Sequence, residues 1–279
     1  MTNPVNQAFT DGPTLHDGIK MPWLGLGVYK TKEGEEVIQS VKSAIAAGYR
    51  SVDTAAVYGN EQGVGQAIRE CGVPREELFI TTKVWNEDQG YETTLKAFET
   101  SRKKLGLDVI DLYLIHWPGK DKYKETWKAL IHLQKEGLVR SIGVSNFQIR
   151  HLRDIIEDTG VVPVVNQVEL HPLNSQKELL QYAREHNIVL EAWSPLMQGN
   201  LDQPVLAKIA EKYGKSVAQI VLRWDLQNGV IVIPKSVKEH RIRENANIFD
   251  FELSAEDMAA IDELNENRRF GSNPDEVLF

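Results

Sequence analysis

The chain has 279 residues, of which 42% are hydrophobic and 26% are charged, and its formal net charge at pH 7 is -8. Such a composition is typical of a globular protein, and the length suits one large α/β domain or two small ones. The acidic balance, without any block of Lys or Arg, argues against nucleic acid and anionic membranes as partners. No apolar run approaches membrane-spanning length.

The N-terminus and the cysteine content bear on where the protein works. The first residues, among them Asn3 and Gln7, are polar and lack an apolar core flanked by positive charge, so no signal peptide is expected. Cys71 is the only cysteine, which excludes an internal disulfide and a multi-cysteine metal site. It falls on the apolar side of a predicted helix, where we expect a buried, inert thiol. A reducing cytoplasm fits these features.

A hairpin is predicted first, and a regular alternation of strands and helices follows it. Asp17 and Gly18 lie between two short extended runs within residues 15–21, which is a hairpin signal. Apolar and β-branched runs predict strands at residues 24–29, 49–52, 79–83, 109–115, 138–144, 161–165, 188–193 and 230–233. Apolar residues at helical spacing follow the strands, and several of these helices are predicted to stop at a glycine: Gly48, Gly106 and Gly137.

About eight strand–helix units in this order specify a closed parallel barrel rather than an open sheet. One more helix is predicted around Met258, Ile261 and Leu264. No linker or domain break interrupts residues 1–279. We therefore expect one α/β domain, a (β/α)₈ TIM barrel with an N-terminal β-hairpin and an extra C-terminal helix. Residues 63–68 almost spell a dinucleotide-binding glycine motif, but Ile68 replaces its third small residue and the segment lies inside a predicted helix, so no Rossmann loop is expected.

Four chemically distinct side chains converge on one face of the predicted barrel. The C-terminal ends of parallel barrel strands meet on one face, which carries the active site. Asp53, Lys83 and His116 lie at such strand ends, and Tyr58 lies in the loop after Asp53, ahead of Asn60 at an expected helix N-cap. Each residue alone is more often a cap, a surface charge or a structural histidine.

Together the four side chains predict a tuned general acid. A phenol with a pKa of about 10 is a weak acid at neutral pH unless its phenolate is stabilised. The ammonium of Lys83 would stabilise it, and Asp53 would hold that ammonium in place. His116 would orient or polarise a carbonyl oxygen that gains negative charge. Three aromatic residues near the same rim predict an apolar mouth, with core packing as the alternative: Tyr29, Trp85 and Trp117.

Eight ordered blocks resemble the aldo-keto reductase superfamily, most of all its bacterial methylglyoxal, glyoxal and 2,5-diketo-D-gluconate reductases. The blocks are MPWLGLGVY (21–29), DTAAVYGNE (53–61), TTKVW (81–85), DLYLIHWP (111–118), GVSNF (143–147), VVNQVELHP (164–172), WSPL (193–196) and IPKS (233–236). The resemblance implies a (β/α)₈ barrel with NADPH across the C-terminal face and no metal. It implies that Tyr58 is the proton donor, tuned by Lys83 and Asp53, and that His116 places the carbonyl.

The resemblance also implies the cofactor contacts. Ser145, Asn146 and Gln167 would hold the nicotinamide carboxamide, and Trp193 would stack on the ring. The remaining implied contacts are Ser194, Leu196 and Gln198 at the pyrophosphate, Lys235, Ser236 and Arg241 at the 2′-phosphate, Glu244 and Asn245 near the adenine, and Val237 elsewhere along the cofactor.

The loops that would close over substrate are short. The segment after residues 116–118 reaches a helix near Tyr123, and the loop after Ser194 is also short. Short loops favour an open pocket for small aldehydes and dicarbonyls, with residues 268–279 as a candidate for the remaining wall. We expect a cytoplasmic monomer whose partner is a small carbonyl substrate.

Two other interpretations remain. A barrel lyase would use Lys83 to form a Schiff base, and a strand-end lysine alone supports that equally well. Such a lyase has no use for the cofactor blocks, and borohydride trapping with a carbonyl substrate would separate the two. A non-catalytic NADPH-binding barrel is the other interpretation, although a pure binder has no need of Lys83 beside Tyr58.

Overall fold

The computed structural model of the chain describes residues 10–276. The polar N-terminal residues on which the absence of a signal peptide was based lie outside this range. Eight parallel strands follow one another in sequence order, each hydrogen-bonded to the next. They are β1 (Leu26–Gly27), β2 (Ser51–Asp53), β3 (Phe79–Val84), β4 (Ile110–Ile115), β5 (Val139–Ser145), β6 (Val165–Glu169), β7 (Val189–Trp193) and β8 (Ile231–Val232).

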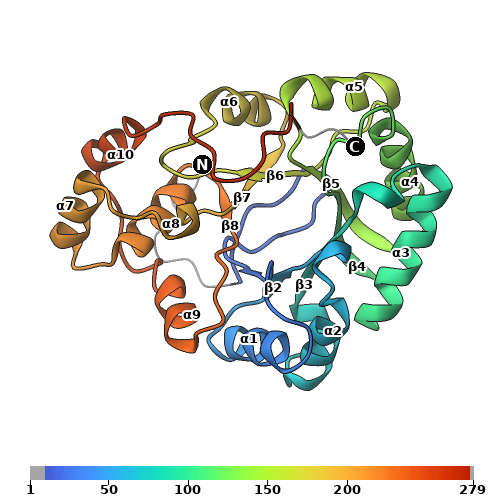
Figure 1. Cartoon of the computed structure of the whole chain (residues 1–279), viewed down its shortest axis with the longest axis horizontal. Helices are drawn as coiled ribbons and strands as arrows, with labels where there is room; N and C mark the ends of the chain where they lie inside the picture. The colour runs from blue at the N-terminus through green and yellow to red at the C-terminus, as the bar shows by residue number, and fades with distance from the viewer. Residues whose placement is uncertain (1–9, 277–279) are drawn as a thin grey trace.

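The sheet closes between its first and last strands. Gly27 forms a parallel bridge with Lys235, and the N–H of Gly25 donates to the carbonyl of Val232 at 2.9 Å. A Cβ atom on Gly27 would lie 2.7 Å from the carbonyl oxygen of Ile233. Glycine is therefore required for the close approach that completes the barrel. The predicted (β/α)₈ TIM barrel is confirmed, with strands inside a ring of helices (Figure 1).

The helices turn an apolar side toward the strands. On α1, for example, Val37, Val41 and Ala44 are fully buried. The α-helices are α1 (Glu35–Ala46), α2 (Glu61–Glu70), α3 (Tyr91–Leu105), α4 (Tyr123–Lys135), α5 (Ile149–Thr159), α6 (Lys177–Glu185), α7 (Pro204–Tyr213), α8 (Val217–Gln227), α9 (Glu239–Ala246) and α10 (Ala255–Asp262). Short 3₁₀ turns are η1 (Ala56–Tyr58), η2 (Arg75–Glu77), η3 (Asn86–Asp88) and η4 (Met197–Gly199). None of the helices in the described range is long and apolar enough to cross a membrane.

The sixth strand is displaced from its predicted position. The apolar run at residues 161–165 predicted a strand there, but β6 begins at Val165 and continues through Asn166, Gln167 and Glu169. Pro163 cannot donate a hydrogen bond to a neighbouring strand, so pairing of a central strand begins after it. The polar residues that were expected to follow the strand are therefore part of it.

The N-terminal hairpin is confirmed: Thr14 and Lys20 form an antiparallel bridge, and the N–H of Leu15 donates to the carbonyl of Ile19 at 2.8 Å. Two smaller predictions need correction. Asn60 precedes α2 as expected, but its side chain does not cap the helix. Cys71 is only partly buried, with its thiol 3.1 Å from the carbonyl of Ile68.

The glycine motif at residues 63–68 lies inside a helix, as predicted, and the structure gives it a packing role. It lies within α2. A Cβ atom on Gly65 would lie 2.2 Å from the carbonyl oxygen of Leu105, so this glycine lets α2 approach the end of α3.

Candidate active site

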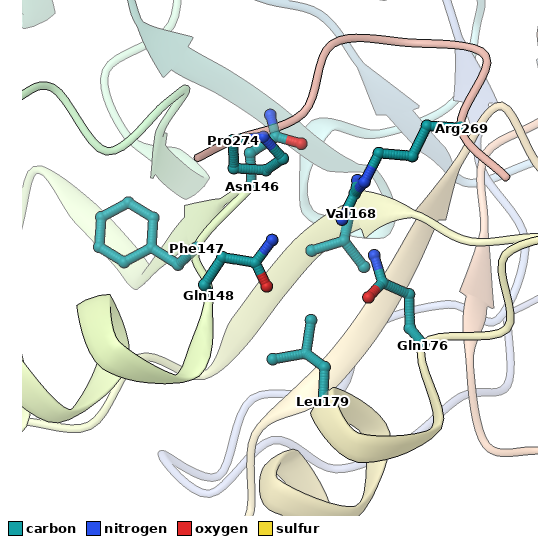
Figure 2. A pocket seen from close by; sticks show the side chains of 8 residues that line it. All are labelled: Asn146, Phe147, Gln148, Val168, Gln176, Leu179, Arg269 and Pro274. Carbon is teal, nitrogen blue, oxygen red and sulfur yellow. The ribbon is translucent and has the colours of Figure 1, made fainter. Parts of the chain in front are cut away.

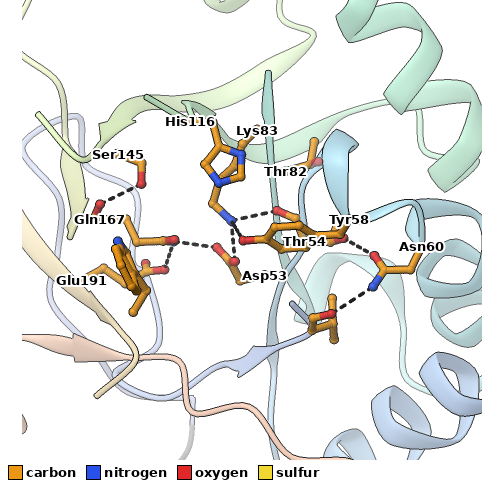
Figure 3. Close-up of polar contacts among 12 residues, drawn as sticks. Asp53, Thr54, Tyr58, Asn60, Thr82, Lys83, His116, Ser145, Gln167 and Glu191 are labelled. Atoms are coloured by element: carbon orange, nitrogen blue, oxygen red, sulfur yellow. Dashed lines mark hydrogen bonds and ion pairs between the residues drawn. The ribbon is translucent and has the colours of Figure 1, made fainter. Parts of the chain in front are cut away.

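The four predicted catalytic side chains lie together at the C-terminal end of the barrel (Figure 3). Asp53 ends β2, and Lys83 lies in β3 with a fully buried side chain. The ammonium of Lys83 donates to Asp53 Oδ1 at 2.6 Å, to the carbonyl of Thr54 at 3.0 Å and to the Tyr58 hydroxyl at 3.3 Å. The phenol and the carboxylate therefore share one ammonium.

The electrostatics of this group differ in one respect from the sequence-based expectation. Burial lowers the pKa of Lys83, but the neighbouring Asp53 and Tyr58 outweigh it and hold that pKa above its ordinary value. Burial raises the pKa of the Tyr58 phenol, and Lys83 offsets only part of the rise. Lys83 acts in the predicted direction, but the phenol does not become a stronger acid than usual. At neutral pH Tyr58 keeps its proton and Lys83 its charge.

His116 follows β4 and is almost fully buried beside the phenol. Its ring lies edge-on to Tyr58, with centroids 5.7 Å apart, and edge-on to Trp85 at 5.1 Å. Burial and the nearby Lys83 hold the pKa of His116 well below its ordinary value, so the imidazole is neutral. Its Nδ1 atom is buried and has no hydrogen-bond partner among the described residues.

Of the three aromatic residues predicted to form the apolar mouth, two contact catalytic side chains. Tyr29 packs on Tyr58, with ring centroids 5.1 Å apart, and 56% of its surface is exposed. Trp85 contacts His116 as described. Trp117 is half-buried, and its backbone carbonyl accepts from Gln89 at 2.7 Å and from the N–H of Gly119 at 2.8 Å.

A buried amide holds the loop that carries Tyr58. The side chain of Asn60 donates to the carbonyls of Val28 and Thr31 at 3.0 and 2.9 Å, and it accepts from the Thr54 hydroxyl at 2.6 Å. These bonds explain why Asn60 does not cap α2. They tie the segment after β1, which bears Tyr29, to the segment after β2, which bears Tyr58.

The predicted nicotinamide residues form a connected polar group. Ser145 donates to the carbonyl of Gln167 at 2.7 Å, and the Asn146 amide donates to the carbonyl of His116 at 3.0 Å. The Trp193 indole donates to Asn146 Oδ1 at 2.8 Å. This arrangement fixes the indole ring relative to the His116 segment.

Sequence reasoning missed one buried acid beside this group. Gln167 Nε2 donates to Asp53 Oδ2 at 2.7 Å and to Glu191 Oε1 at 2.6 Å. Glu191 lies in β7 and is fully buried. The sequence did carry a signal for Glu191, because it is a charged residue within an apolar strand. It also lies two positions before Trp193 and therefore on the same face of that strand.

The predicted phosphate-binding residues lie on the two loops that follow β7 and β8, except for Arg241, which lies on α9. Ser194, Met197 and Gln198 have left-handed φ values of 47°, 55° and 52°. Such backbone is costly for non-glycine residues, is typical of functional loops and can turn successive N–H groups toward an anion. Lys235 and Arg241 are exposed and form no ion pair with any other described residue.

The other predicted cofactor residues lie on the same two loops and on α9. Ser236 accepts from the N–H of Lys238 at 3.1 Å, and Val237 next to it is 40% exposed. Leu196 lies in the strained loop and packs on the core. Glu244 and Asn245 lie on α9, half-buried and buried respectively.

Comparison with known proteins settles the family. The aldo/keto reductase family model matches residues 23–266. The chain belongs to the aldo/keto reductase family. It is 65% identical to glyoxal reductase of Bacillus subtilis (strain 168) over 96% of this chain and 98% of that one. It is 52% identical to methylglyoxal reductase DkgA of Escherichia coli (strain K12), over 94% and 96% of the two chains.

A solved structure supports both the fold and the cofactor expectation. A mutant of Gox0644 in complex with NADPH superposes with a TM-score of 0.92 at 49% identity, over 96% of this chain and 98% of that one. The sequence-based assignment to the aldo-keto reductases is confirmed, and the protein is an oxidoreductase. The features that fit NADPH in this aldo/keto reductase are the strained loop after β7 and the cations Lys235 and Arg241, which have no ion-pair partner among the described residues.

The same geometry argues against the lyase interpretation. A Schiff-base lysine needs a neutral, accessible amine. In this aldo/keto reductase Lys83 is fully buried, donates three hydrogen bonds and has a raised pKa. Its charge is used to hold Tyr58.

The C-terminal tail of this aldo/keto reductase is anchored at the end of β6. Glu169 is fully buried and accepts from the N–H groups of Phe270 and Gly271 at 2.6 and 3.0 Å. Two residues of the same tail, Arg269 and Pro274, line a small pocket together with Asn146, Phe147, Gln148, Val168, Gln176 and Leu179 (Figure 2). The part of the predicted wall at residues 277–279 lies outside the described residues.

Proposed function

We propose that residues 1–279 form one domain that reduces small aldehydes and dicarbonyls, such as glyoxal and methylglyoxal, to alcohols with NADPH. The observation that carries this proposal is the protonated Tyr58 hydroxyl 3.3 Å from the Lys83 ammonium, with a neutral imidazole packed on its ring. The names of the reductases described above support the substrate class.

Four side chains have separate roles when a hydride and a proton are added to the carbonyl. NADPH, when bound, supplies the hydride that the carbonyl carbon accepts. His116 donates an N–H to the carbonyl oxygen and so fixes its position. Tyr58 gives its proton to that oxygen as negative charge develops, and Lys83 stabilises the phenolate that remains. Asp53 keeps the ammonium aimed at the phenol.

The cofactor is held by residues away from this chemistry. Ser145, Asn146 and Gln167 are proposed to bind the carboxamide, with Trp193 stacked on the ring. Lys235 and Arg241 are proposed to pair with the 2′-phosphate, because both are exposed cations without an ion-pair partner in the described part of the chain. The residues after Ser194 are proposed to bind the pyrophosphate.

Substrate size follows from the loops. Only residues 116–122 connect β4 to α4, and the segment after β7 reaches α7 at Pro204. These short loops provide few side chains that can contact a large apolar substrate. Little binding energy is therefore available from parts of the substrate away from its carbonyl. Carbonyls with an adjacent electron-withdrawing group compensate, because their carbon accepts hydride more readily.

Initial rates across a panel of carbonyls test this proposal. We expect methylglyoxal, glyoxal and activated aromatic aldehydes to exceed a steroid ketone in kcat/KM, and NADPH to exceed NADH as the donor. A steroid ketone that exceeds methylglyoxal would overturn the substrate assignment and leave the reductase class standing. We further propose a cytoplasmic monomer that removes reactive aldehydes, for which sedimentation equilibrium should give a single species of 31.6 kDa.

A further inference from the structure

Glu191 joins the catalytic group through one amide. Its Oε1 atom accepts from Gln167 Nε2 at 2.6 Å, and the same nitrogen donates to Asp53 Oδ2 at 2.7 Å. The other oxygen of Asp53 accepts from Lys83 at 2.6 Å. A continuous path thus runs from Glu191 through Gln167 and Asp53 to Lys83 and Tyr58 (Figure 3).

The charges along this path are unbalanced when both acids are ionised. Asp53 and Glu191 are two carboxylates, whereas Lys83 is the one ammonium among the groups that face Glu191. All three side chains are at most 3% exposed. The neighbours of Glu191 on the adjacent strands add no charge: Gln167 on β6 and Ile231 on β8. Its second oxygen, Oε2, is buried and has no hydrogen-bond partner among the described residues.

We propose that Glu191 is a positioning residue of the active site, which fixes the amide of Gln167 and, when ionised, places a second negative charge behind the Asp53–Lys83 pair. The proposal rests on the proposed role of Tyr58 as the acid. Glu191 does not touch the phenol and acts on it through Gln167, Asp53 and Lys83.

The first part of the proposal follows from the donors of the amide. Both N–H bonds of Gln167 Nε2 are used by acceptors on Asp53 and Glu191. A flipped amide would place its carbonyl oxygen against two acceptors and would lose both hydrogen bonds. The side-chain Oε1 atom of Gln167, unlike its backbone carbonyl, accepts no hydrogen bond within residues 10–276, and it is the atom left to bind the nicotinamide carboxamide.

The second part follows from the ionisation of Glu191. Burial and the neighbouring Asp53 raise the pKa of Glu191 to about 8, with Lys83 opposing them. Glu191 therefore passes from neutral to ionised between neutral and alkaline pH. The added negative charge destabilises the phenolate of Tyr58 and makes it a weaker acid. Burial also raises the pKa of the Tyr58 phenol from its ordinary value, so we assign a transition near pH 8 to Glu191.

The profile of log kcat against pH tests the ionisation, with Glu191→Gln as the variant. We expect the wild-type profile to fall through a transition near pH 8. Glu191→Gln should lack that transition, so that its ratio of kcat at pH 10 to kcat at pH 6 exceeds that of the wild type. Glu185→Gln, an exposed change of the same charge on α6, is the control and should keep the transition.

The dissociation constant of NADPH, measured by fluorescence titration without substrate, tests the orientation of the amide. Glu191→Gln keeps an acceptor for Gln167 and should keep the wild-type value. Glu191→Met removes the acceptor and should raise the constant at least about fivefold, because a buried donor is left unpaired. If the Gln variant fails to fold, the Met variant, which also lacks the charge, carries the pH comparison.

A transition near pH 8 that persists in an uncharged variant, or an unchanged NADPH affinity in Glu191→Met, would overturn the proposal. Difference infrared spectra give a readout that needs no turnover. The wild type should lose more protonated-carboxyl signal than Glu191→Gln between pH 6 and pH 10, and equal losses would count against the proposal. The proposed function has a separate test. If Tyr58 is not the acid, Tyr58→Phe turns over normally, whereas the NADPH dissociation constant and the infrared carboxyl signal still report on Glu191.

Discussion

The hydroxyl of Tyr58 is under opposing influences. Burial raises its pKa, and the ammonium of Lys83 at 3.3 Å offsets part of the rise. The net result is an acid that stays protonated at neutral pH and a cation already in place for the phenolate. Catalysis of this kind depends on a charge that is prepared before the reaction rather than on a strongly acidic group. The neutral His116 adds a donor without adding a second positive charge.

Tyr58→Phe removes the proton donor and keeps the ring that packs on Tyr29 and His116. We expect kcat to fall at least about a hundredfold, the scale of one positioned general acid, with little change in NADPH affinity. Steady-state rates and a fluorescence titration would measure both. Tyr29→Phe is the matched control, since it removes the hydroxyl of the neighbouring exposed ring and should leave kcat nearly unchanged. Near-normal turnover in Tyr58→Phe would contradict the mechanism.

Arg241→Ala tests the recognition of the 2′-phosphate. A guanidinium can pair with a phosphate through two N–H bonds, and charged hydrogen bonds contribute about 1.5–3 kcal/mol. The dissociation constant of NADPH should rise at least about tenfold, while that of NADH stays near its wild-type value. Arg243→Ala on the same helix is the control, because Arg243 is paired with Glu239 at 3.0 Å. Equal weakening of both cofactors would show that Arg241 does not distinguish them.

At the scale of elements, segments far apart in sequence hold the site. The loop with Tyr58 is tied by Asn60 to the segment after β1. The C-terminal tail is tied to β6 by Glu169, and it lies against the Trp193 ring. The aromatic residue proposed to stack on the nicotinamide is thus held on one side by Asn146 and on another by the tail.

Gly271→Ala tests whether the tail positions Trp193. A Cβ atom on Gly271 would lie 2.3 Å from the Trp193 ring, so the ring or the tail must shift. Overpacking of this kind costs about 1–3 kcal/mol, and 1.4 kcal/mol is tenfold in affinity. We expect the NADPH dissociation constant to rise by roughly tenfold, measured by fluorescence titration. Ser272→Ala changes an exposed neighbour and should have no effect. A wild-type constant in Gly271→Ala would mean that the tail does not position the ring.

The sequence predicted the barrel and the meeting of Asp53, Tyr58, Lys83 and His116, because apolar strand runs and their polar ends are local signals. It misplaced β6, since an apolar run interrupted by Pro163 masked a strand whose inward face is polar. Glu191 is a charged residue in an apolar strand, which is a local signal, but its role depends on Gln167 of β6, which links it to Asp53 of β2 only in the folded barrel. The net pKa of Tyr58 depends on burial, which the sequence does not reveal.

At the scale of the whole molecule, the buried charged residues fall into two groups: those of the active site and those that pack between strands and helices. The charges inside the barrel are linked to one another through Asp53, Lys83, Gln167 and Glu191. Charged side chains buried between strands and helices form hydrogen bonds with neighbouring elements. Glu61 of α2, for example, accepts from the Thr82 hydroxyl of β3 at 2.8 Å. Asp225 on α8 is an exception among the described residues, because it is fully buried and neither carboxyl oxygen has a hydrogen-bond partner.

Asp225 should make the stability of the protein depend on pH. Burial raises the pKa of its carboxyl well above the ordinary value in the folded state. The folded protein therefore holds a proton that the unfolded chain releases above a pH of about 4, so the free energy of unfolding falls as pH rises from there. Asp225→Asn keeps the shape and cannot ionise. We expect urea unfolding to show the variant more stable than the wild type by about 1–3 kcal/mol at pH 8, the scale of an unsatisfied buried group.

The advantage of Asp225→Asn should be much smaller at pH 4, where about half of the unfolded chains have this carboxyl protonated, and should approach zero below about pH 3, where it is protonated in both folded and unfolded states. Asp262→Asn is the control, because this carboxylate on α10 accepts from the Trp224 indole at 2.9 Å and is not left without a partner. The control should give no comparable gain at pH 8. A stability difference for Asp225→Asn that is the same at pH 4 and pH 8 would show that the side chain acts through packing rather than through its proton.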